Sequence, residues 1–462
     1  MSTNTIDSIV SFRNSQGEKA SGTLRGISRQ SVSLEVYNPH SVAQLSEMLS
    51  ELTIRRQGRI VYQGSAVVTT LINTGIYLMM SATLTEPWKE LNELHADEQG
   101  VQQEIDRFFE DLNQYNSIRP EFRLSITNLR NQLSELSRWL EQIDLMSATE
   151  DNKRELVERI QSPIMPSLFE NLMFFEEQAK AVEPEYWDIH RAYTQRDLHP
   201  LTLRSPFVHR TFSKPLGYAG DYEMVNMIFR DPNEGPSTYF QTINRLFLTE
   251  GPAVAHRNRI LILQNLLEKQ IDAAIKNNSK LKILNLGCGP AIEIQRLLRS
   301  RKMDDRIEFN LMDFSEPTLN YTRSQLEQAS KDGDSHPKIN FIQRSVDQIL
   351  RLSAKLQQEE SNVYDFVYCA GLFDYFSQRA CQRVMKLFSH LVKPGGMIFA
   401  TNVHANNPAQ AVMEYIAEWH LVCRDEKDMS DMLPGFGEQR IYTDDSGVNV
   451  FIEIDKPLAV DG

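Results

Sequence analysis

A short glycine-containing turn carries the residue types best suited to chemistry. The apolar run 282–286 leads into Gly287-Cys288-Gly289 and then into an amphipathic stretch. Glycine lets the backbone turn sharply and lets a ligand approach without meeting a Cβ atom. Asp313 stands 24 residues after Gly289, at the end of the next predicted strand. A carboxylate there can accept hydrogen bonds from both hydroxyl groups of a ribose. Strand, turn, helix and acid together predict a nucleoside-binding site.

The glycine spacing favours one nucleoside cofactor over another. A dinucleotide-binding turn has a third glycine three residues after the second, where this chain has Ile292. The turn instead resembles the glycine-rich loop of class I S-adenosylmethionine-dependent methyltransferases. Later segments resemble that family in the same order. Segment 340–346 resembles its third strand and the turn that contacts the adenine, and segment 364–371 resembles its fourth strand. Segment 391–398 resembles the Leu-Lys-Pro-Gly-Gly turn that precedes its fifth strand. The resemblance covers roughly residues 250–456 and implies S-adenosylmethionine as the cofactor.

The resemblance also implies which residues contact the cofactor. Asn285 stands where the family usually has an acidic residue, and Ser345 where an aspartate often contacts the adenine amino group. Both replacements still form hydrogen bonds. The implied cofactor-binding residues are Gly287, Cys288, Gly289, Glu293, Asp313, Phe314, Ser345, Val346, Ala370 and Arg257.

A narrower resemblance concerns segments 207–210, 214–224, 287–293 and 419–424. They are similar to blocks of bacterial methyltransferases assigned to 3-hydroxypalmitic acid methyl ester biosynthesis. In that group Ala291 and Glu293 are regular features of the turn. The resemblance implies a methyl acceptor that is the carboxylate of a fatty acid or of a similar small apolar acid.

Three residues are candidates for catalysis. Segment 214–224 is rich in glycine and tyrosine without helical periodicity, and it is either a structural loop or a lid that excludes water. As a lid it would bring Tyr218 to the sulfonium through cation–π attraction. A carboxylate acceptor is already ionised at neutral pH, but a hydroxyl acceptor would use a general base. His404 and Asp374 follow predicted strands and are the candidate bases, unless they are ordinary loop and helix-cap residues.

Residues 1–85 read as a small β-rich domain. Short apolar runs at 31–36, 59–62 and 66–69 alternate with glycine-containing breaks, which suits an antiparallel barrel. Segment 22–34 resembles the first hairpin of PilZ domains, many of which bind cyclic di-GMP. Gly26 and Ser31 depart from that family's ligand-binding turn, only Ser28 fits it, and no Arg-x-x-x-Arg arm precedes it. We therefore expect weak or absent cyclic di-GMP binding and a docking role for the barrel.

Residues 86–200 form a predicted helical region, and 201–250 a lid or cap segment. An apolar stripe has helical spacing, and it consists of Ile126, Leu129, Leu133, Leu136, Leu140 and Ile143. The stripe either packs in a hairpin against a helix at 101–112 or forms the seam of a homodimer. Residues 251–462 alternate strands and helices, which predicts a doubly wound α/β fold with a parallel sheet.

Composition limits the class of protein. With 62 acidic and 49 basic residues the chain is too acidic to favour nucleic acid as a partner. The four cysteines form no Cys-x-x-Cys pair, so we expect no metal site and no disulfide framework. No secretory signal or transmembrane segment is evident, which favours the cytoplasm. Two hypotheses remain: a methyltransferase with a small-molecule acceptor, or a signalling scaffold whose methyltransferase fold has lost its activity.

Overall fold

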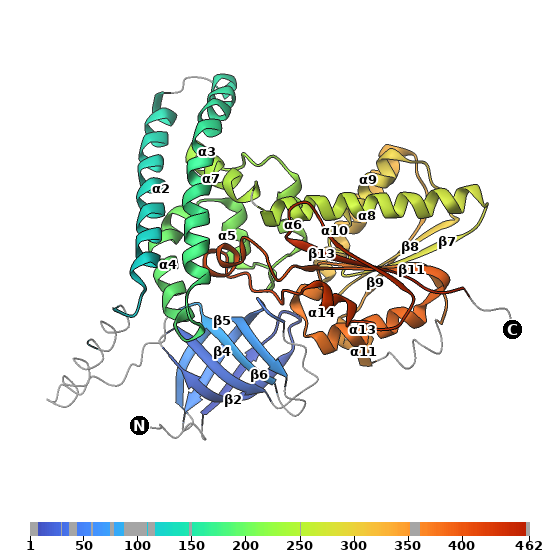
Figure 1. The fold of residues 1–462 in the computed structure, drawn as a ribbon, viewed down its shortest axis with the longest axis horizontal. Helices are drawn as coiled ribbons and strands as arrows, with labels where there is room; N and C mark the ends of the chain where they lie inside the picture. The colour runs from blue at the N-terminus through green and yellow to red at the C-terminus, as the bar shows by residue number, and fades with distance from the viewer. Residues whose placement is uncertain are drawn as a thin grey trace.

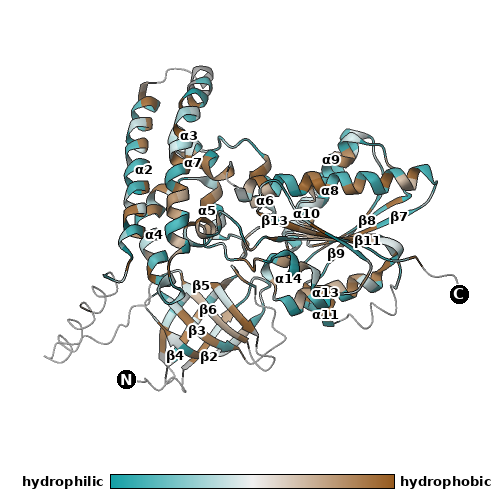
Figure 2. Ribbon diagram, viewed as in Figure 1, coloured by the Kyte–Doolittle hydropathy of each residue, from teal (hydrophilic) through white to brown (hydrophobic). Residues whose placement is uncertain are grey.

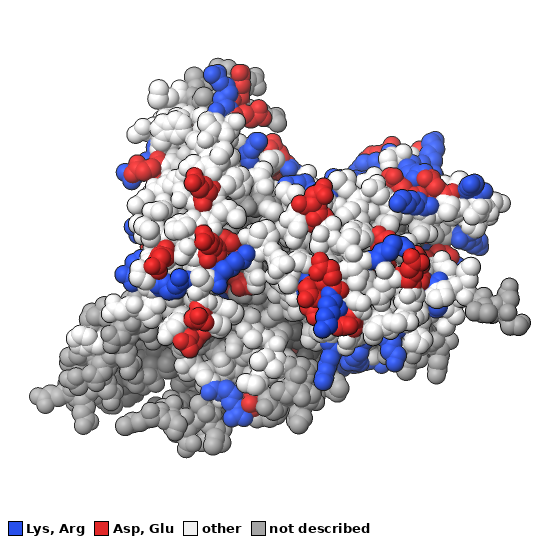
Figure 3. Space-filling model, in the orientation of Figure 1, with Lys and Arg blue, Asp and Glu red and all other residues white. Residues whose placement is uncertain are grey.

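The structure, a computed structural model, describes residues 8–28, 30–36, 44–56, 59–73, 78–86, 109, 116–146, 150–249, 251–351 and 361–458. Figure 1 shows a barrel, a group of helices standing on it, and an α/β layer beside both. No helix in these ranges is long and apolar enough to cross a membrane. On the face drawn in Figure 3 acidic and basic side chains are interspersed rather than gathered into one basic surface.

The N-terminal strands close into an antiparallel barrel, as predicted. Its strands are β1 (Ser8–Arg13), β2 (Lys19–Ile27), β3 (Ser31–Val36), β4 (Met48–Arg56), β5 (Arg59–Asn73) and β6 (Leu78–Leu84), in the order β1-β2-β3-β6-β5-β4. The break expected at Gly64 is wrong, because β5 runs through it as one strand. A Cβ atom on Gly64 would lie 2.6 Å from the Tyr62 hydroxyl. This glycine therefore makes room for a tyrosine rather than for a turn.

The predicted apolar stripe lies on α2 (Pro120–Met146) and is used inside the chain. Its first five residues are buried, and Ile143 packs against the same core. Figure 2 shows polar and apolar residues alternating along α2 and α3 (Glu150–Lys180), the helix against which it packs. The helix expected at 101–112 falls almost wholly outside the described residues. Because α3 covers the stripe, this face is not open to a second copy as a seam.

Short helices join the long pair to the α/β layer. They contribute to one shared apolar core, and they are α4 (Trp187–Thr202), α5 (Pro206–Ser213), α6 (Tyr222–Phe229) and α7 (Thr238–Leu248). Buried Glu176 on α3 accepts hydrogen bonds from the backbone N–H groups of Ala411 and Val412. Glu176 thereby holds the start of one π-helical turn, η4 (Val412–Ile416).

The C-terminal part is a doubly wound α/β layer. Its strands are β7 (Leu281–Leu286), β8 (Ile307–Asp313), β9 (Lys338–Gln343), β10 (Tyr364–Ala370), β11 (Val392–Val403), β12 (Glu438–Thr443) and β13 (Asn449–Asp455), in the order β12-β13-β11-β10-β7-β8-β9. The expectation of a wholly parallel sheet needs correction, because β13 runs antiparallel to both neighbours. β12 was not predicted.

Helices cover both faces of this sheet (Figure 1). One face carries α8 (Gly251–Lys276), α9 (Ile292–Ser300) and α10 (Glu316–Gly333). The other carries α11 (Val346–Arg351), α13 (Gln378–Leu391) and α14 (Glu426–Ser430). Most residues of the central strands β7, β8 and β10 are buried, as expected for strands covered on both faces, whereas the edge strands β9 and β12 are only partly buried. The carboxyl ends of β7, β8 and β10 meet at one edge, which is where such sheets bind ligands.

Candidate functional site

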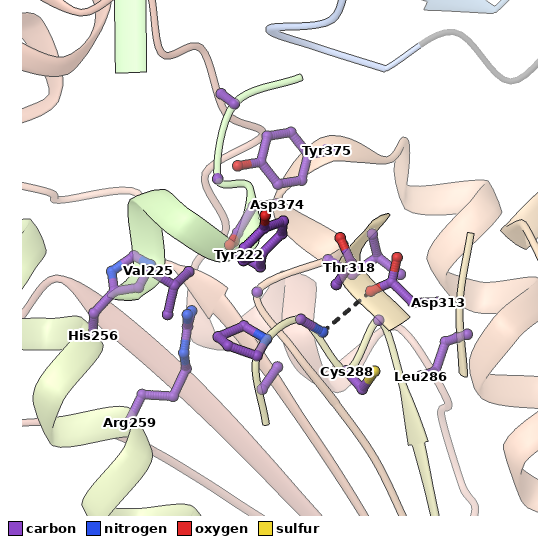
Figure 4. A pocket seen from close by; sticks show the side chains of 18 of the residues that line it. Tyr222, Val225, His256, Arg259, Leu286, Cys288, Asp313, Thr318, Asp374 and Tyr375 are labelled. Carbon is purple, nitrogen blue, oxygen red and sulfur yellow. Dashed lines mark hydrogen bonds between the residues drawn. The ribbon is translucent and has the colours of Figure 1, made fainter. Parts of the chain in front are cut away.

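A cavity opens at the carboxyl ends of β7, β8 and β10. Its lining includes the glycine turn, Asp313 and residues from segment 214–224, and also residues of α8 and of the barrel. Figure 4 shows Asp313, Thr318 and Cys288 on one side of the cavity, with His256 and Arg259 on the other. The cavity thus brings together segments that lie far apart in the sequence.

The glycine turn has the geometry expected of it. Gly287 and Gly289 have φ values of +71° and +50°, in the left-handed region that favours glycine. A Cβ atom on Gly289 would meet nothing within 4 Å, so the space beside this residue is open to a ligand. The Thr322 hydroxyl donates to the Gly289 carbonyl oxygen at 2.7 Å and holds the turn in place.

Asp313 lies beside the turn, at the end of β8. Its Oδ2 accepts the Gly289 N–H at 3.1 Å and its Oδ1 accepts the Ser315 N–H at 3.0 Å. The Phe314 N–H is a third backbone donor to this carboxylate, which also lines the cavity where a ligand would lie. Burial raises the pKa of Asp313 to about 6, and the backbone donors oppose that shift.

A buried polar triad explains the departure at Asn285. The Asn285 amide donates to the Tyr368 hydroxyl at 2.9 Å and to Glu293 Oε1 at 3.3 Å, and the Tyr368 hydroxyl donates to that oxygen at 2.7 Å. Burial raises the pKa of Glu293. All three side chains line the cavity. An acid at position 285 would place two carboxyl groups against each other, whereas asparagine supplies a donor.

Segment 214–224 forms one wall of the cavity. The Tyr218 ring lies 5.0 Å from the Phe314 ring, and its hydroxyl is 3.3 Å from Thr318 Oγ1. Asp221 caps α6 and forms two hydrogen bonds of 2.9 Å with the Arg210 guanidinium. The hydrogen bonds of Asp221 fix one end of the segment, and Tyr218 is only partly buried. Both features suit a cavity wall that closes over a ligand.

Asp374 also lies in the cavity wall, within the short helix η3 (Phe373–Tyr375). Its Oδ1 accepts the Val403 N–H at 2.6 Å. Burial raises the pKa of Asp374 to about 6, and the nearby charge of Arg259 opposes this shift. The neighbouring Tyr375 hydroxyl accepts the Trp419 indole N–H at 2.9 Å.

The structure brings most, but not all, of the predicted site residues together. The cavity lining contains Tyr218, Gly287, Cys288, Gly289, Glu293, Asp313, Phe314, Val346, Ala370 and Asp374. Ser345 lines an adjoining cavity with Phe314 instead. His404 lies outside both, with its Nδ1 accepting the Asn406 N–H at 3.1 Å. The guanidinium of Arg257 donates to the carbonyls of Ile228 and Leu248, and so braces helix ends away from the cavity.

Two polar residues of α8 that line the cavity were not predicted from the sequence. His256 and Arg259 stand three positions apart and so share a helix face, which Arg257 does not. The His256 Nδ1 lies 2.9 Å from the Pro252 carbonyl, and burial lowers its pKa to about 3. The imidazole is therefore neutral, with Nδ1–H donating and Nε2 left as an acceptor. Helical spacing in the sequence already places the cavity-lining residues of α8 on one face of that helix. They are Pro252, His256, Arg259, Ile260 and Leu263.

Comparison with known proteins agrees with this description. Residues 283–396 match a family described as a methyltransferase domain. Over 169 residues the chain is 25% identical to the ubiquinone biosynthesis O-methyltransferase of Rickettsia akari, a match that covers 36% of this chain. The chain spans 58% of the length of that curated relative.

Solved structures with a similar arrangement include two bacterial proteins. A possible exported protein from Bordetella parapertussis aligns with a TM-score of 0.43 and 15% identity over 56% of this chain and 88% of its own. The magnesium protoporphyrin IX methyltransferase of Synechocystis PCC 6803, with bound S-adenosylhomocysteine, aligns with a TM-score of 0.34 and 13% identity over 50% and 93%.

Proposed function

We propose that the protein is an S-adenosylmethionine-dependent O-methyltransferase whose acceptor is the carboxylate of a fatty acid or a similar small apolar acid. The observation that carries the proposal is Asp313, a buried carboxylate that lines the cavity beside an open glycine turn. This arrangement fits the hydroxyl groups of a ribose. The methyltransferase match over residues 283–396 supports the same cofactor.

Different residues of the cavity would have different roles in such a reaction. When bound, S-adenosylmethionine supplies an electrophilic methyl group on a sulfonium. Asp313 would bind the ribose, and Phe314 and Val346 offer apolar surface to the adenine. Tyr218, on the wall formed by segment 214–224, would exclude water and present its ring to positive charge. Positioning supplies most of the rate, because a carboxylate acceptor needs no base.

A second, apolar cavity supports the acceptor class. It lies among α5, α7, the start of α8 and η4. Pro252, Met413 and Trp419 line both this cavity and the larger one. Because the two cavities share these lining residues, an apolar acid in the larger cavity would place its tail beside this apolar region.

The test uses the purified protein, isotope-labelled S-adenosylmethionine and a panel of saturated and hydroxylated fatty acids. We expect labelled methyl esters, identified by mass spectrometry, and release of the label as methanol in mild base. Label that survives base would place the methyl group on a hydroxyl as an ether, and would overturn the acceptor class. Absence of any cofactor binding would favour the scaffold hypothesis instead.

Cofactor affinity should depend on pH through Asp313. Protonation turns one carboxyl oxygen into a donor and leaves fewer acceptor positions for the ligand hydroxyls, and the pKa of Asp313 in the protein is about 6. Affinity for S-adenosylhomocysteine should therefore be constant above pH 7 and fall as the pH drops through 6, approaching about tenfold per unit. Calorimetry from pH 5 to 8 measures this. Asp313→Asn should remove the dependence, whereas Asp374→Asn, which changes the other buried acid of similar pKa, should keep it.

A further inference from the structure

Arg259 is a buried cation for which the described part of the chain supplies no hydrogen-bond or ion-pair partner. Its residue is 6% exposed, and its guanidinium faces the large cavity (Figure 4). Within the described part of the chain it makes no hydrogen bond or ion pair, and its buried Nε has no acceptor. A guanidinium has five N–H donors, and leaving them unmet in a buried place is costly. A group from outside the chain is therefore needed.

The surrounding residues make room for Arg259 without satisfying it. Gly371, with φ +94°, has no side chain, and a Cβ atom there would lie 2.7 Å from the Arg259 Nη1. The acids that face Arg259 are Asp374 and Glu293. Asp374 accepts the Val403 N–H, and Glu293 accepts from Tyr368 and Asn285. Both acids are bonded elsewhere, so the guanidinium remains directed at the cavity.

We propose that Arg259 binds the carboxylate of a ligand in this cavity. The planar fork of a guanidinium matches a carboxylate with two parallel hydrogen bonds. The inference rests on the proposed function, in which two ligands carry such a group: the methionine portion of the cofactor and the acceptor acid. Both would meet Arg259 through the same chemistry, and the experiment separates them.

Calorimetry on Arg259→Gln distinguishes the two sources. S-adenosylhomocysteine carries the carboxylate, and 5′-methylthioadenosine is a nucleoside that lacks it. If Arg259 binds the cofactor carboxylate, the substitution should lower the affinity for S-adenosylhomocysteine about 30-fold and leave the affinity for 5′-methylthioadenosine unchanged. If Arg259 binds the acceptor carboxylate, the substitution should lower the affinity for decanoate more than the affinity for decanol. Both affinities are measured in the presence of saturating S-adenosylhomocysteine. Arg259→Lys should recover part of either loss.

Stability provides the second readout. Arg259→Gln removes an unpartnered buried cation and should leave the melting temperature of the ligand-free protein unchanged or higher. Arg257→Gln is the matched control: it removes two hydrogen bonds to backbone carbonyls, so it should lower the melting temperature and leave the ligand ratios unchanged. Ratios insensitive to Arg259→Gln would overturn the inference alone. A wild-type protein that binds neither nucleosides nor decanoate would overturn the proposed function as well.

A different set of contacts concerns the barrel. Gln16, in the β1–β2 turn, and Gln44, before β4, line the large cavity. Ser15, Gln16 and Glu18 also line the adjoining cavity, opposite Ser345. Buried Glu47 ties these segments together, accepting the Ser15 N–H at 2.7 Å and the Gln44 N–H at 2.9 Å.

The barrel is also bonded to the walls of the cavity. The Ser46 hydroxyl donates to the His420 carbonyl at 2.8 Å and accepts the His420 N–H. The Met48 N–H donates to the Gly217 carbonyl at 2.8 Å. His420 and Gly217 are the chain neighbours of Trp419 and Tyr218, which line the cavity. Movement of the barrel would therefore pull directly on two cavity walls.

We infer that the barrel is the outer wall of the cofactor cavity and controls how fast the cofactor enters and leaves. Ser46→Ala removes both side-chain hydrogen bonds to His420. Dissociation of S-adenosylhomocysteine, followed by intrinsic tryptophan fluorescence in a stopped-flow instrument, should accelerate about 10-fold. Gln16→Ala, which leaves the bonds between the parts intact, should raise the same rate about threefold by removing a wall contact.

The matched control is Ser33→Ala. Ser33 bonds to Ser81 within the barrel at 3.1 Å, so its loss perturbs the barrel without touching the cavity. Exchange rates should then match the wild type. Unchanged rates in both Ser46→Ala and Gln16→Ala, in proteins that melt cooperatively, would overturn the inference and leave the barrel as a separate docking module.

Discussion

Replacing Asp313 with alanine is expected to weaken the binding of S-adenosylhomocysteine about 1000-fold. The change removes two hydrogen bonds from ligand hydroxyls to an ionised acceptor, each worth about 1.5–3 kcal/mol. It also releases the Gly289 N–H, and so loosens the turn that borders the ligand. Isothermal calorimetry at pH 7.5, where the carboxylate is ionised, measures the loss.

Asp332→Ala serves as the matched control for this experiment. Asp332 is an aspartate on α10, exposed and paired with Arg299, and it lies outside the cavity. Its replacement should leave the affinity within twofold of the wild type. An Asp313→Ala protein that melts cooperatively and still binds S-adenosylhomocysteine within threefold of the wild type would refute the ribose assignment.

Replacing Tyr218 with alanine should reduce the rate of methyl transfer about 100-fold. The ring covers the cavity beside Phe314, and its loss admits water and misplaces the reacting groups. Loss of a cation–π contact, worth about 0.5–2 kcal/mol, should lower the affinity for S-adenosylmethionine more than that for S-adenosylhomocysteine, whose sulfur carries no charge. The ratio of the two affinities can be measured by calorimetry before any acceptor is known.

Thermal melting separates this lid role from a purely structural one. Truncation of an aromatic side chain in a protein core typically lowers the free energy of unfolding by about 3–5 kcal/mol. Tyr218 is only partly buried, so Tyr218→Ala should lower it by less. Tyr218→Phe keeps the ring and removes only the contact to Thr318, so it should retain most of the activity. A large fall in melting temperature with an unchanged affinity ratio would show that Tyr218 only packs the loop.

Local sequence patterns determined the strand–turn–helix unit and its acid. Gly287, Gly289 and Asp313 stand where the spacing placed them, a helix follows the glycine turn, and β3 has its predicted bounds. These features depend on neighbours a few residues away, or on one strand following another. The alternation of apolar residues and the preference of glycine for positive φ are enough to specify them.

Only the tertiary structure decided which distant side chains share the cavity. Arg257 and Arg259 are equivalent as residue types, but the rotation of α8 against the sheet turns only Arg259 inward. His404 follows a strand as expected, yet the chain turns it toward Asn406. Gln16 and Gln44 reach the site because Ser46 and Met48 of the barrel bond to loops hundreds of residues away. Packing between separate elements sets these positions, and no local pattern encodes them.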